Sequence, residues 1–177
     1  MKTNFCYLLI GNSRFHWAIK VDNKYIFSHS PIENPVPDTI KKENILWASV
    51  GSYETNFLKK ENELKIQDMC FKNFPKYFGI DRVLGSIAAL KKTDNPHKKN
   101  IVIADFGTIL SITKINDKGE LIGGQLIPGF LTQLKSMVFN TKALKMPKNL
   151  NIPIDNFLTH TPEAMVRGVT NSLIGAI

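Results

Sequence analysis

Residues 101–130, which read IVIADFGTILSITKINDKGELIGGQLIPGF, decide the fold of this chain. They open with a short apolar run over 101–104, rich in β-branched side chains, which predicts a buried strand. A second strand is predicted over 109–115 and a third over 121–127. The sequence Asp-Lys-Gly at 117–119 predicts a tight turn between these two. The stretch therefore predicts a three-stranded meander.

The turn after the first of these strands carries three residues suited to an anion site. The apolar run ends on Asp105, and Gly107 and Thr108 follow. A glycine lets a phosphate approach the backbone closely, and a threonine hydroxyl can donate a hydrogen bond to it. Asp105 would be placed to hold a cation or its water. An ordinary hairpin with a polar turn is the alternative that these residues leave open.

The N-terminal part of the chain repeats this order of elements. An apolar strand is predicted over 5–10, and the turn Gly11-Asn12-Ser13 follows. A second strand is predicted over 16–21, and a third is predicted to start with residues 25–27. The two turn glycines, Gly11 and Gly107, lie 96 residues apart. We interpret this as an internal duplication of the meander, which predicts two lobes of similar construction.

The segments outside the meanders predict a fourth strand, several helices and a linker. The strand is predicted over 45–50, and the polar, proline-broken segment 91–100 is predicted to link the two lobes. Asp81 lies in the first turn of a predicted helix, off its apolar face, where an acid could simply favour the positive end of the helix dipole. The predicted helices cover 53–64, 79–90, 130–143 and 161–177.

Composition limits the classes of function. The chain has 177 residues and a net charge of +8, but its lysine pairs are dispersed without an aromatic-interleaved basic stripe. We therefore expect a solvated basic surface and no nucleic-acid partner, with a basic nucleic-acid binder as the alternative. No apolar run approaches the roughly 20 residues of a membrane span, and the N-terminus lacks a signal-peptide pattern. We expect a cytoplasmic protein without membrane contact, with Cys6 and Cys70 as reduced core thiols.

Several short motifs occur in an order that is more specific than any one of them. With these motifs the chain resembles the type III pantothenate kinases, which belong to the superfamily of acetate and sugar kinases, heat-shock proteins and actin. LIGNSR at 9–14 and DFGT at 105–108 resemble the two phosphate motifs of that family, and GIDR at 79–82 resembles its pantothenate motif. GGQLIPG at 123–129 and TPEA at 161–164, with Gly168, also match the family pattern.

The resemblance implies a fold, a reaction and partners. The implied fold is α/β, with two ribonuclease-H-like lobes of the actin-like ATPase superfamily over 1–95 and 96–177, the second lobe incomplete at its C-terminus. The implied reaction is transfer of the γ-phosphate of ATP, with Mg²⁺, to the hydroxyl of pantothenate, the first step of coenzyme A biosynthesis. The family also implies a monovalent cation (K⁺ or NH₄⁺) and a homodimer.

The resemblance also assigns roles to individual residues. Asp81 matches the catalytic base, which is sensible because phosphoryl transfer needs an acceptor for the substrate hydroxyl proton. Asp105 matches the ligand of the monovalent cation, and Thr108 matches an ATP contact. The residues implied to bind pantothenate are Gly79, Ile80, Asp81, Arg82 and Thr161. Those implied to line the ATP phosphates are Gly11, Asn12, Ser13 and Arg14, with His16 where the family often has lysine.

Two departures from the family pattern motivate other functions. Leu9 stands where the family usually carries an acid, and a leucine cannot hold Mg²⁺ or its waters. The family continues with further strands and a glycine-rich adenosine turn, which nothing in this chain matches. A catalytically impaired relative that binds a ligand or a partner is one alternative. A kinase of the same superfamily with another small acceptor is the other.

Overall fold

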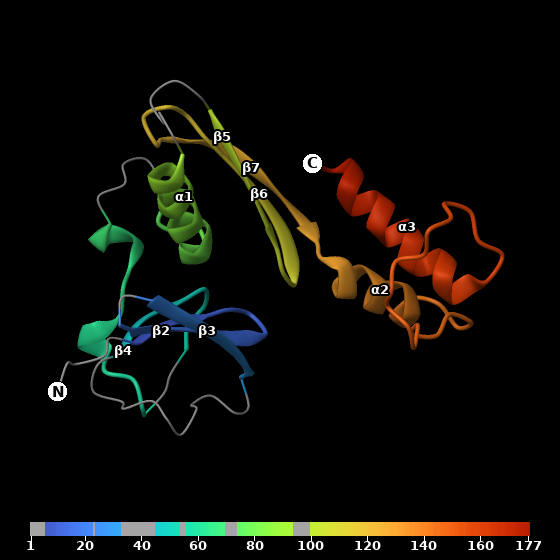
Figure 1. Cartoon of the computed structure of the whole chain (residues 1–177), viewed down its shortest axis with the longest axis horizontal. Helices are drawn as coiled ribbons and strands as arrows, with labels where there is room; N and C mark the ends of the chain where they lie inside the picture. The colour runs from blue at the N-terminus through green and yellow to red at the C-terminus, as the bar shows by residue number, and fades with distance from the viewer. Residues whose placement is uncertain (1–5, 23, 33–44, 54–55, 70–73, 94–99) are drawn as a thin grey trace. The chain divides into compact units, whose positions relative to one another are not determined.

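The computed structural model describes residues 6–22, 24–32, 45–53, 56–69, 74–93 and 100–177 (Figure 1). It is a mixed α/β structure with two sheets, each with its own helices. The chain divides into two compact units. Unit 1 comprises residues 1–94 with 118–120, and unit 2 comprises 95–117 with 121–177.

Unit 1 is built on a four-stranded sheet in the order β3-β2-β1-β4. The strands are β1 (Cys6–Ile10), β2 (Arg14–Val21), β3 (Lys24–Pro31) and β4 (Ile45–Ser49). β1, β2 and β3 form an antiparallel meander, and β4 pairs with β1 in parallel. The predicted meander of the N-terminal part is therefore confirmed, and β3 starts one residue before the predicted start at Tyr25 and runs to Pro31.

One face of this sheet forms the core of unit 1. Leu8, Ile10, Phe15, Trp17 and Trp47 are among its buried side chains. Their alternation along each strand follows from the period of two in a pleated strand, because neighbouring side chains point to opposite faces. Cys6 also lies in this core, as expected of a reduced thiol, whereas Cys70 lies outside the described residues.

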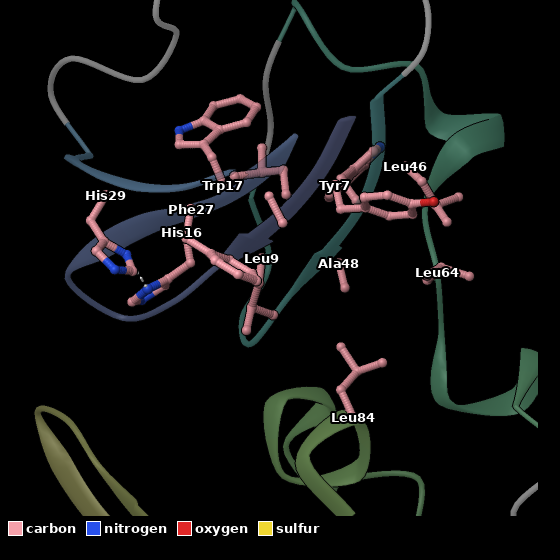
Figure 2. A pocket seen from close by; sticks show the side chains of 13 residues that line it. Tyr7, Leu9, His16, Trp17, Phe27, His29, Leu46, Ala48, Leu64 and Leu84 are labelled. Atoms are coloured by element: carbon pink, nitrogen blue, oxygen red, sulfur yellow. Dashed lines mark hydrogen bonds between the residues drawn. The ribbon is translucent and has the colours of Figure 1, made fainter. Parts of the chain in front are cut away.

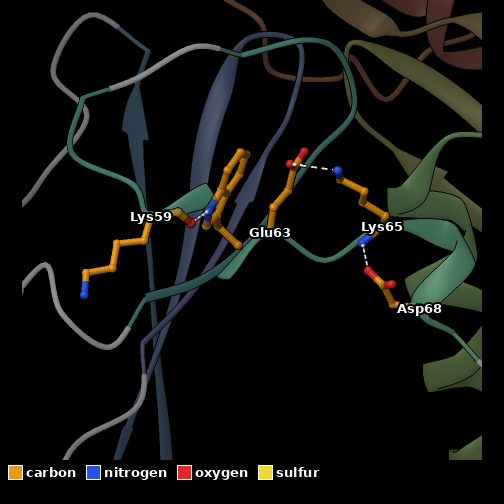
Figure 3. A network of polar contacts seen from close by, with 5 residues as sticks. Lys59, Glu63, Lys65 and Asp68 are labelled. Atoms are coloured by element: carbon orange, nitrogen blue, oxygen red, sulfur yellow. Dashed lines mark hydrogen bonds and ion pairs between the residues drawn. The ribbon is translucent and has the colours of Figure 1, made fainter. Parts of the chain in front are cut away.

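The helix predicted over 53–64 is wrong. In the described part of this segment, the structure has only a short 3-10 turn, η2 (Lys60–Asn62). A second 3-10 turn, η3 (Ile66–Asp68), follows the segment. The indole Nε1 of Trp47 donates a hydrogen bond of 2.9 Å to the carbonyl oxygen of Lys59 (Figure 3). Glu63 forms a parallel bridge with Trp47. These bonds tie the extended residues on both sides of η2, Lys59 and Glu63, to β4. Tertiary pairing thereby overrides the helical preference of the polar residues.

Helix α1 (Ile80–Lys92) belongs to the same unit and begins after Gly79. Its buried side chains are those of Ile80, Val83 and Ser86, at the spacing that places them on one face. Ser86 satisfies its hydroxyl by donating to the carbonyl oxygen of Arg82 at 2.8 Å. The predicted helix is confirmed, with Asp81 in its first turn.

Unit 2 is built on the antiparallel sheet β5-β6-β7. β5 (Ile101–Phe106), β6 (Ile109–Ile115) and β7 (Leu121–Pro128) form the predicted meander. The tight turn before β7 contains Gly119 at φ 78°, a left-handed conformation that favours glycine. β5 runs two residues further than predicted, because its antiparallel pairing continues to the pair Phe106 and Leu110.

Two helices follow this sheet in unit 2, α2 (Phe130–Phe139) and α3 (Thr161–Gly175). They share a core with β6 that contains Leu110, Leu134 and Val169. α2 ends four residues before the predicted Ala143, because Asn140 caps it: the side-chain amide of Asn140 donates to the carbonyl oxygen of Ser136 at 2.8 Å. Within the described ranges, no helix is both long enough and apolar enough to cross a bilayer.

Candidate active site

The first predicted phosphate motif forms the turn between β1 and β2. The backbone N–H of Gly11 donates to the carbonyl oxygen of Arg14 at 2.9 Å, which closes the turn. Asn12, Ser13 and Arg14 are exposed at its tip. A Cβ atom on Gly11 would lie 3.3 Å from both the Arg14 carbonyl oxygen and His16 Nε2, closer than most real contacts. The turn is thus compact and presents polar groups to solvent.

Leu9, at the end of β1, offers no oxygen ligand beside this turn. Its strand neighbour across the β1–β2 ladder is His16. Hard cations such as Mg²⁺ require oxygen ligands, and an aliphatic side chain provides none. Among the residues that the structure describes, no group of three or more His, Cys, Asp or Glu side chains could hold a metal ion. The residues present therefore do not fit a protein-bound Mg²⁺ at Leu9.

The GIDR motif forms the N-terminus of α1, and Gly79 makes room there for the carboxylate of Asp81. Asp81 Oδ1 accepts a hydrogen bond of 2.8 Å from the backbone N–H of Arg82. A Cβ atom on Gly79 would lie 2.5 Å from this same oxygen. A side chain at position 79 would therefore push the carboxylate out of its position over the first turn. The negative charge there also interacts favourably with the helix dipole.

Arg82 is held by an aromatic side chain from the preceding loop. Its guanidinium carbon lies 3.9 Å from the centre of the Phe78 ring, a cation–π arrangement, and Phe78 in turn contacts Phe74. Partial burial lowers the pKa of Arg82, and the charge of Asp81 opposes this effect. Ile80, also predicted to bind substrate, has a buried side chain, so only its backbone could face a ligand.

The second predicted phosphate motif forms the turn between β5 and β6, and the start of α2 clamps it. The backbone N–H of Gly107 donates to the carbonyl oxygen of Ile109 at 3.1 Å. The carbonyl oxygen of Thr108 accepts bonds from the backbone N–H of Gly129 at 2.9 Å and from the hydroxyl of Thr132 at 2.7 Å. A Cβ atom on Gly129 would collide with the backbone of Gly107 and Thr108. Hydrogen bonds and close backbone packing therefore tie this turn to the start of α2.

Gly129 and Thr132 are not among the residues that the sequence predicts for the site. The signal that could have found them is the Pro-Gly pair at the end of a strand, which marks a close backbone approach just before a helix. That the approach is to the turn at Thr108, more than 20 residues earlier, depends on the antiparallel pairing of β6 and β7.

Asp105 lies inside β5 rather than after it. It stands opposite Ser111 in the β5–β6 ladder, and its side chain is exposed. The prediction that the strand ends before this acid is therefore wrong, because backbone pairing extends beyond the apolar run. The acid projects from the sheet close to the turn that contains Thr108.

Thr161 is the first residue of α3 and is exposed. Proline follows it at the helix start, as predicted. Arg167 on the same helix anchors the preceding loop, donating from Nε to Asn156 Oδ1 at 2.9 Å and from Nη1 to the carbonyl oxygen of Pro153 at 3.3 Å. The start of α3 is thereby held firmly within unit 2.

The structure thus brings the predicted site residues together in separate local groups. Unit 1 contains the turn with Gly11 and the helix start with Asp81, whereas unit 2 contains the turn with Thr108 and, apart from it in the sequence, Thr161.

Comparison with known proteins identifies relatives over most of this chain. Residues 32–177 match the sequence profile of a family described as type III pantothenate kinase. A protein of that name from Synechocystis is 28% identical over 96% of this chain and 68% of its own length. Another from Fervidobacterium nodosum is 35% identical over 59% of this chain, and the match spans 39% of that relative's length.

A solved structure shares the fold. The crystal structure of a conserved protein from Campylobacter jejuni, described as a Baf family transcriptional activator, aligns with a TM-score of 0.65 at 22% identity. The alignment covers 97% of this chain and 77% of that one. At this identity the likeness concerns the fold alone.

Proposed function

The chain belongs to the type III pantothenate kinase family, and we propose that it transfers the γ-phosphate of ATP to pantothenate, the first step of coenzyme A biosynthesis. The proposal extends to the roles of individual residues in this reaction. Two similar meanders, each with a glycine turn, support a fold of two ribonuclease-H-like lobes for this family member.

Asp81 is the proposed catalytic base, and its placement is the observation that carries the proposal. The carboxylate is fixed over the first turn of α1 by the amide of Arg82, in space that Gly79 leaves empty. A carboxylate so positioned accepts the proton of the substrate hydroxyl as that oxygen attacks phosphorus. Arg82, oriented by Phe78, is the proposed donor to the oxygens of pantothenate. Thr161 is also a proposed pantothenate contact.

The two glycine turns are the proposed phosphate contacts. The proposed contacts in unit 1 are Gly11, Asn12, Ser13, Arg14 and His16. In unit 2 the proposed contact is Thr108. Mg²⁺, when bound to the nucleotide, supplies charge neutralisation. The side chain of Leu9 has no oxygen atom that could bind Mg²⁺, so we propose no protein ligand for Mg²⁺ at position 9.

Asp105 is the proposed ligand of a monovalent cation, K⁺ or NH₄⁺. Its exposed carboxylate beside the Thr108 turn is the feature that supports this role. We further propose that the protein is a cytoplasmic homodimer without membrane contact. We also propose that it binds no nucleic acid, because its lysine pairs are dispersed.

The test is formation of 4'-phosphopantothenate from ATP and pantothenate, with Mg²⁺ and with or without K⁺. We expect Asp81→Asn to lower kcat by a factor on the order of 10² to 10⁴, because it removes the base while keeping the shape. Asp22→Asn is the matched control, since Asp22 lies in a turn at φ 45°, where asparagine is well tolerated. Turnover by Asp81→Asn equal to that of the parent chain would refute the assignment of the base.

The leucine at position 9, where the family usually has an acid, supports a second candidate function: a catalytically impaired relative that binds its ligands without turnover. A chain that binds pantothenate and ATP without turnover would show a raised melting temperature with each ligand but no product. Replacing pantothenate by acetate or a sugar in the same melting experiment tests the other kinase of the superfamily.

A further inference from the structure

Two histidines face each other across the strands β2 and β3 of unit 1. His16 and His29 are directly opposite in the antiparallel ladder. Their Nδ1 atoms lie 2.9 Å apart and are hydrogen-bonded, with the rings at 75° and their centres 4.9 Å apart (Figure 2). Both side chains are exposed. A ladder of backbone hydrogen bonds thus holds two imidazoles side by side and accessible to solvent.

The pair lies on the opposite face of the sheet from the Trp17 core. Leu9 is opposite His16 in the β1–β2 ladder, so Leu9, His16 and His29 form a row across three strands. The row borders a cavity of about 300 Å³. The cavity is otherwise lined mainly by apolar side chains, with Leu84 of α1 pointing into it from the opposite side (Figure 2). The two imidazoles are therefore polar groups at the rim of a mostly apolar hollow.

The separation of the two nitrogens suits a chelated metal ion. A metal–imidazole bond is about 2.0–2.1 Å long. Two such bonds at a right angle put the nitrogens about 2.9 Å apart, whereas a tetrahedral angle puts them about 3.4 Å apart. The observed 2.9 Å is the length of the hydrogen bond between the two imidazoles, so a small rotation of each ring brings both nitrogens within reach of one ion. Among first-row divalent ions, Cu²⁺ and Ni²⁺ bind such nitrogen ligands most strongly.

We propose that His16 and His29 form a binding site for a divalent transition-metal ion of the copper or nickel type, coordinated through both Nδ1 atoms. The imidazole that now donates the hydrogen bond moves its hydrogen to Nε2, so both Nδ1 lone pairs become available without net proton release. Each ring turns so that its lone pair points at the shared ion, while the strand backbones stay paired. Water or an anionic ligand fills the remaining positions, so the ion exchanges readily.

The site does not depend on the proposed kinase activity, although His16 is also a proposed nucleotide contact. Imidazole nitrogen is a poor ligand for Mg²⁺ and a good one for Cu²⁺ and Ni²⁺. Metal binding measured without ATP and pantothenate therefore tests this site alone, and its failure leaves the kinase proposal standing.

The experiment is calorimetric titration of the whole chain with NiCl₂, CuCl₂ and MgCl₂. We expect one equivalent of Cu²⁺, one equivalent of Ni²⁺ that binds more weakly than Cu²⁺, and no Mg²⁺ at this site. His16→Gln and His29→Gln should each weaken Ni²⁺ binding at least tenfold. His160→Gln is the matched control, because His160 is an exposed histidine in unit 2 whose replacement should leave binding unchanged.

A spectroscopic measurement guards against variants that fold poorly. The electron paramagnetic resonance spectrum of the parent chain with one equivalent of Cu²⁺ should show coupling to two imidazole nitrogens. A spectrum without coupling to two such nitrogens would overturn the proposal, as would a folded His29→Gln chain that binds Ni²⁺ as tightly as the parent.

Discussion

At the scale of single residues, the absence of a side chain at Gly79 sets the position of Asp81. The backbone at Gly79 has φ −61° and ψ 129°, which any residue can adopt, so the glycine is needed for space and not for conformation. The neighbouring atom, Asp81 Oδ1, is the end of a short side chain that can rotate away. A methyl group at position 79 would therefore move the carboxylate without breaking the helix.

We predict that Gly79→Ala lowers kcat by at least tenfold with a small change in stability, because it displaces Asp81, the proposed base, from its position over the first turn of α1. Gly85→Ala is the control in the same helix, since a Cβ atom there would meet no atom within 4 Å. It should stabilise the chain by about 1 kcal/mol and keep kcat, because alanine is the better helix former. Steady-state kinetics measures kcat, and urea unfolding measures stability. Equal kcat for the two variants would show that Gly79 does not position Asp81.

Cys6 gives the chain a dependence of stability on alkaline pH. Burial raises the pKa of the Cys6 thiol from 9.0 to about 11. Between pH 9 and pH 11 the thiol therefore stays neutral in the folded chain, whereas it already ionises in the unfolded chain. The stabilisation is complete below pH 9 and is lost as the pH rises through 11.

We predict that the free energy of unfolding of the parent chain falls more steeply between pH 9 and pH 11 than that of Cys6→Ala. Urea unfolding at several pH values measures the two slopes. Parallel curves would mean that the thiol ionises equally in the folded and unfolded chains.

At the scale of elements, the contact between the start of α2 and the β5–β6 turn is the main device of unit 2. Gly129 lies directly against the backbone of Gly107 and Thr108, and Thr132 bonds to the carbonyl oxygen of Thr108. A side chain at position 129 would meet backbone atoms, which cannot rotate away as the Asp81 carboxylate can. The strand end and the helix would have to separate.

Gly129→Ala should therefore destabilise the chain by about 2 kcal/mol or more, because the turn that contains Thr108 loses its support. It should also raise the KM for ATP, since Thr108 is the proposed ATP contact in this turn. Gly123→Ala on β7 is the stability control, since a Cβ atom there meets nothing within 4 Å. Chemical denaturation and ATP-dependent kinetics provide the readouts. Gly129→Ala as stable as Gly123→Ala would contradict the clamp.

Local patterns are sufficient to predict elements whose partners are near in sequence. β6 has the predicted bounds, because the apolar alternation and the Asp-Lys-Gly turn act over a few residues. The conformation of the segment around Lys60 could not be predicted in this way, because it depends on a bridge to Trp47 and on a hydrogen bond from the Trp47 indole. Such long-range bonds leave no periodic trace in the segment itself.

The candidate site divides in the same way. Asp81 and Gly79 are neighbours in one motif, so their shared geometry follows from the sequence and from helix stereochemistry. The pairing of His16 with His29 depends on the register of β2 and β3, and a slip of one residue would put one imidazole on the other face. Contacts set by register could not be predicted from the motifs.

At the scale of the whole molecule, the two units have separate hydrophobic cores. The core of unit 1 contains both tryptophans of the chain, Trp17 and Trp47, whereas that of unit 2 contains Leu134, Met165 and Val169. Tryptophan fluorescence therefore reports on unit 1, and far-ultraviolet circular dichroism reports on both units.

We predict that Leu134→Ala, which truncates a side chain with 0% exposure, destabilises unit 2 by about 2–5 kcal/mol. The part of the helical signal that comes from α2 and α3 should then be lost at lower urea, while the tryptophan transition keeps its midpoint, because the cavity lies in the core without tryptophans. Equal shifts of both transitions would mean that the two units unfold as one cooperative body.

The facing imidazoles of His16 and His29 also bear on how the protein is handled. The whole chain has only four histidines, fewer than a common affinity tag carries. A tagged preparation would bind nickel through its tag, which would mask any nickel bound by His16 and His29 on the β2–β3 hairpin. Untagged chain on a nickel resin should be retarded and should elute with a little imidazole, whereas ion exchange in chelator-treated buffer yields protein with an empty hairpin.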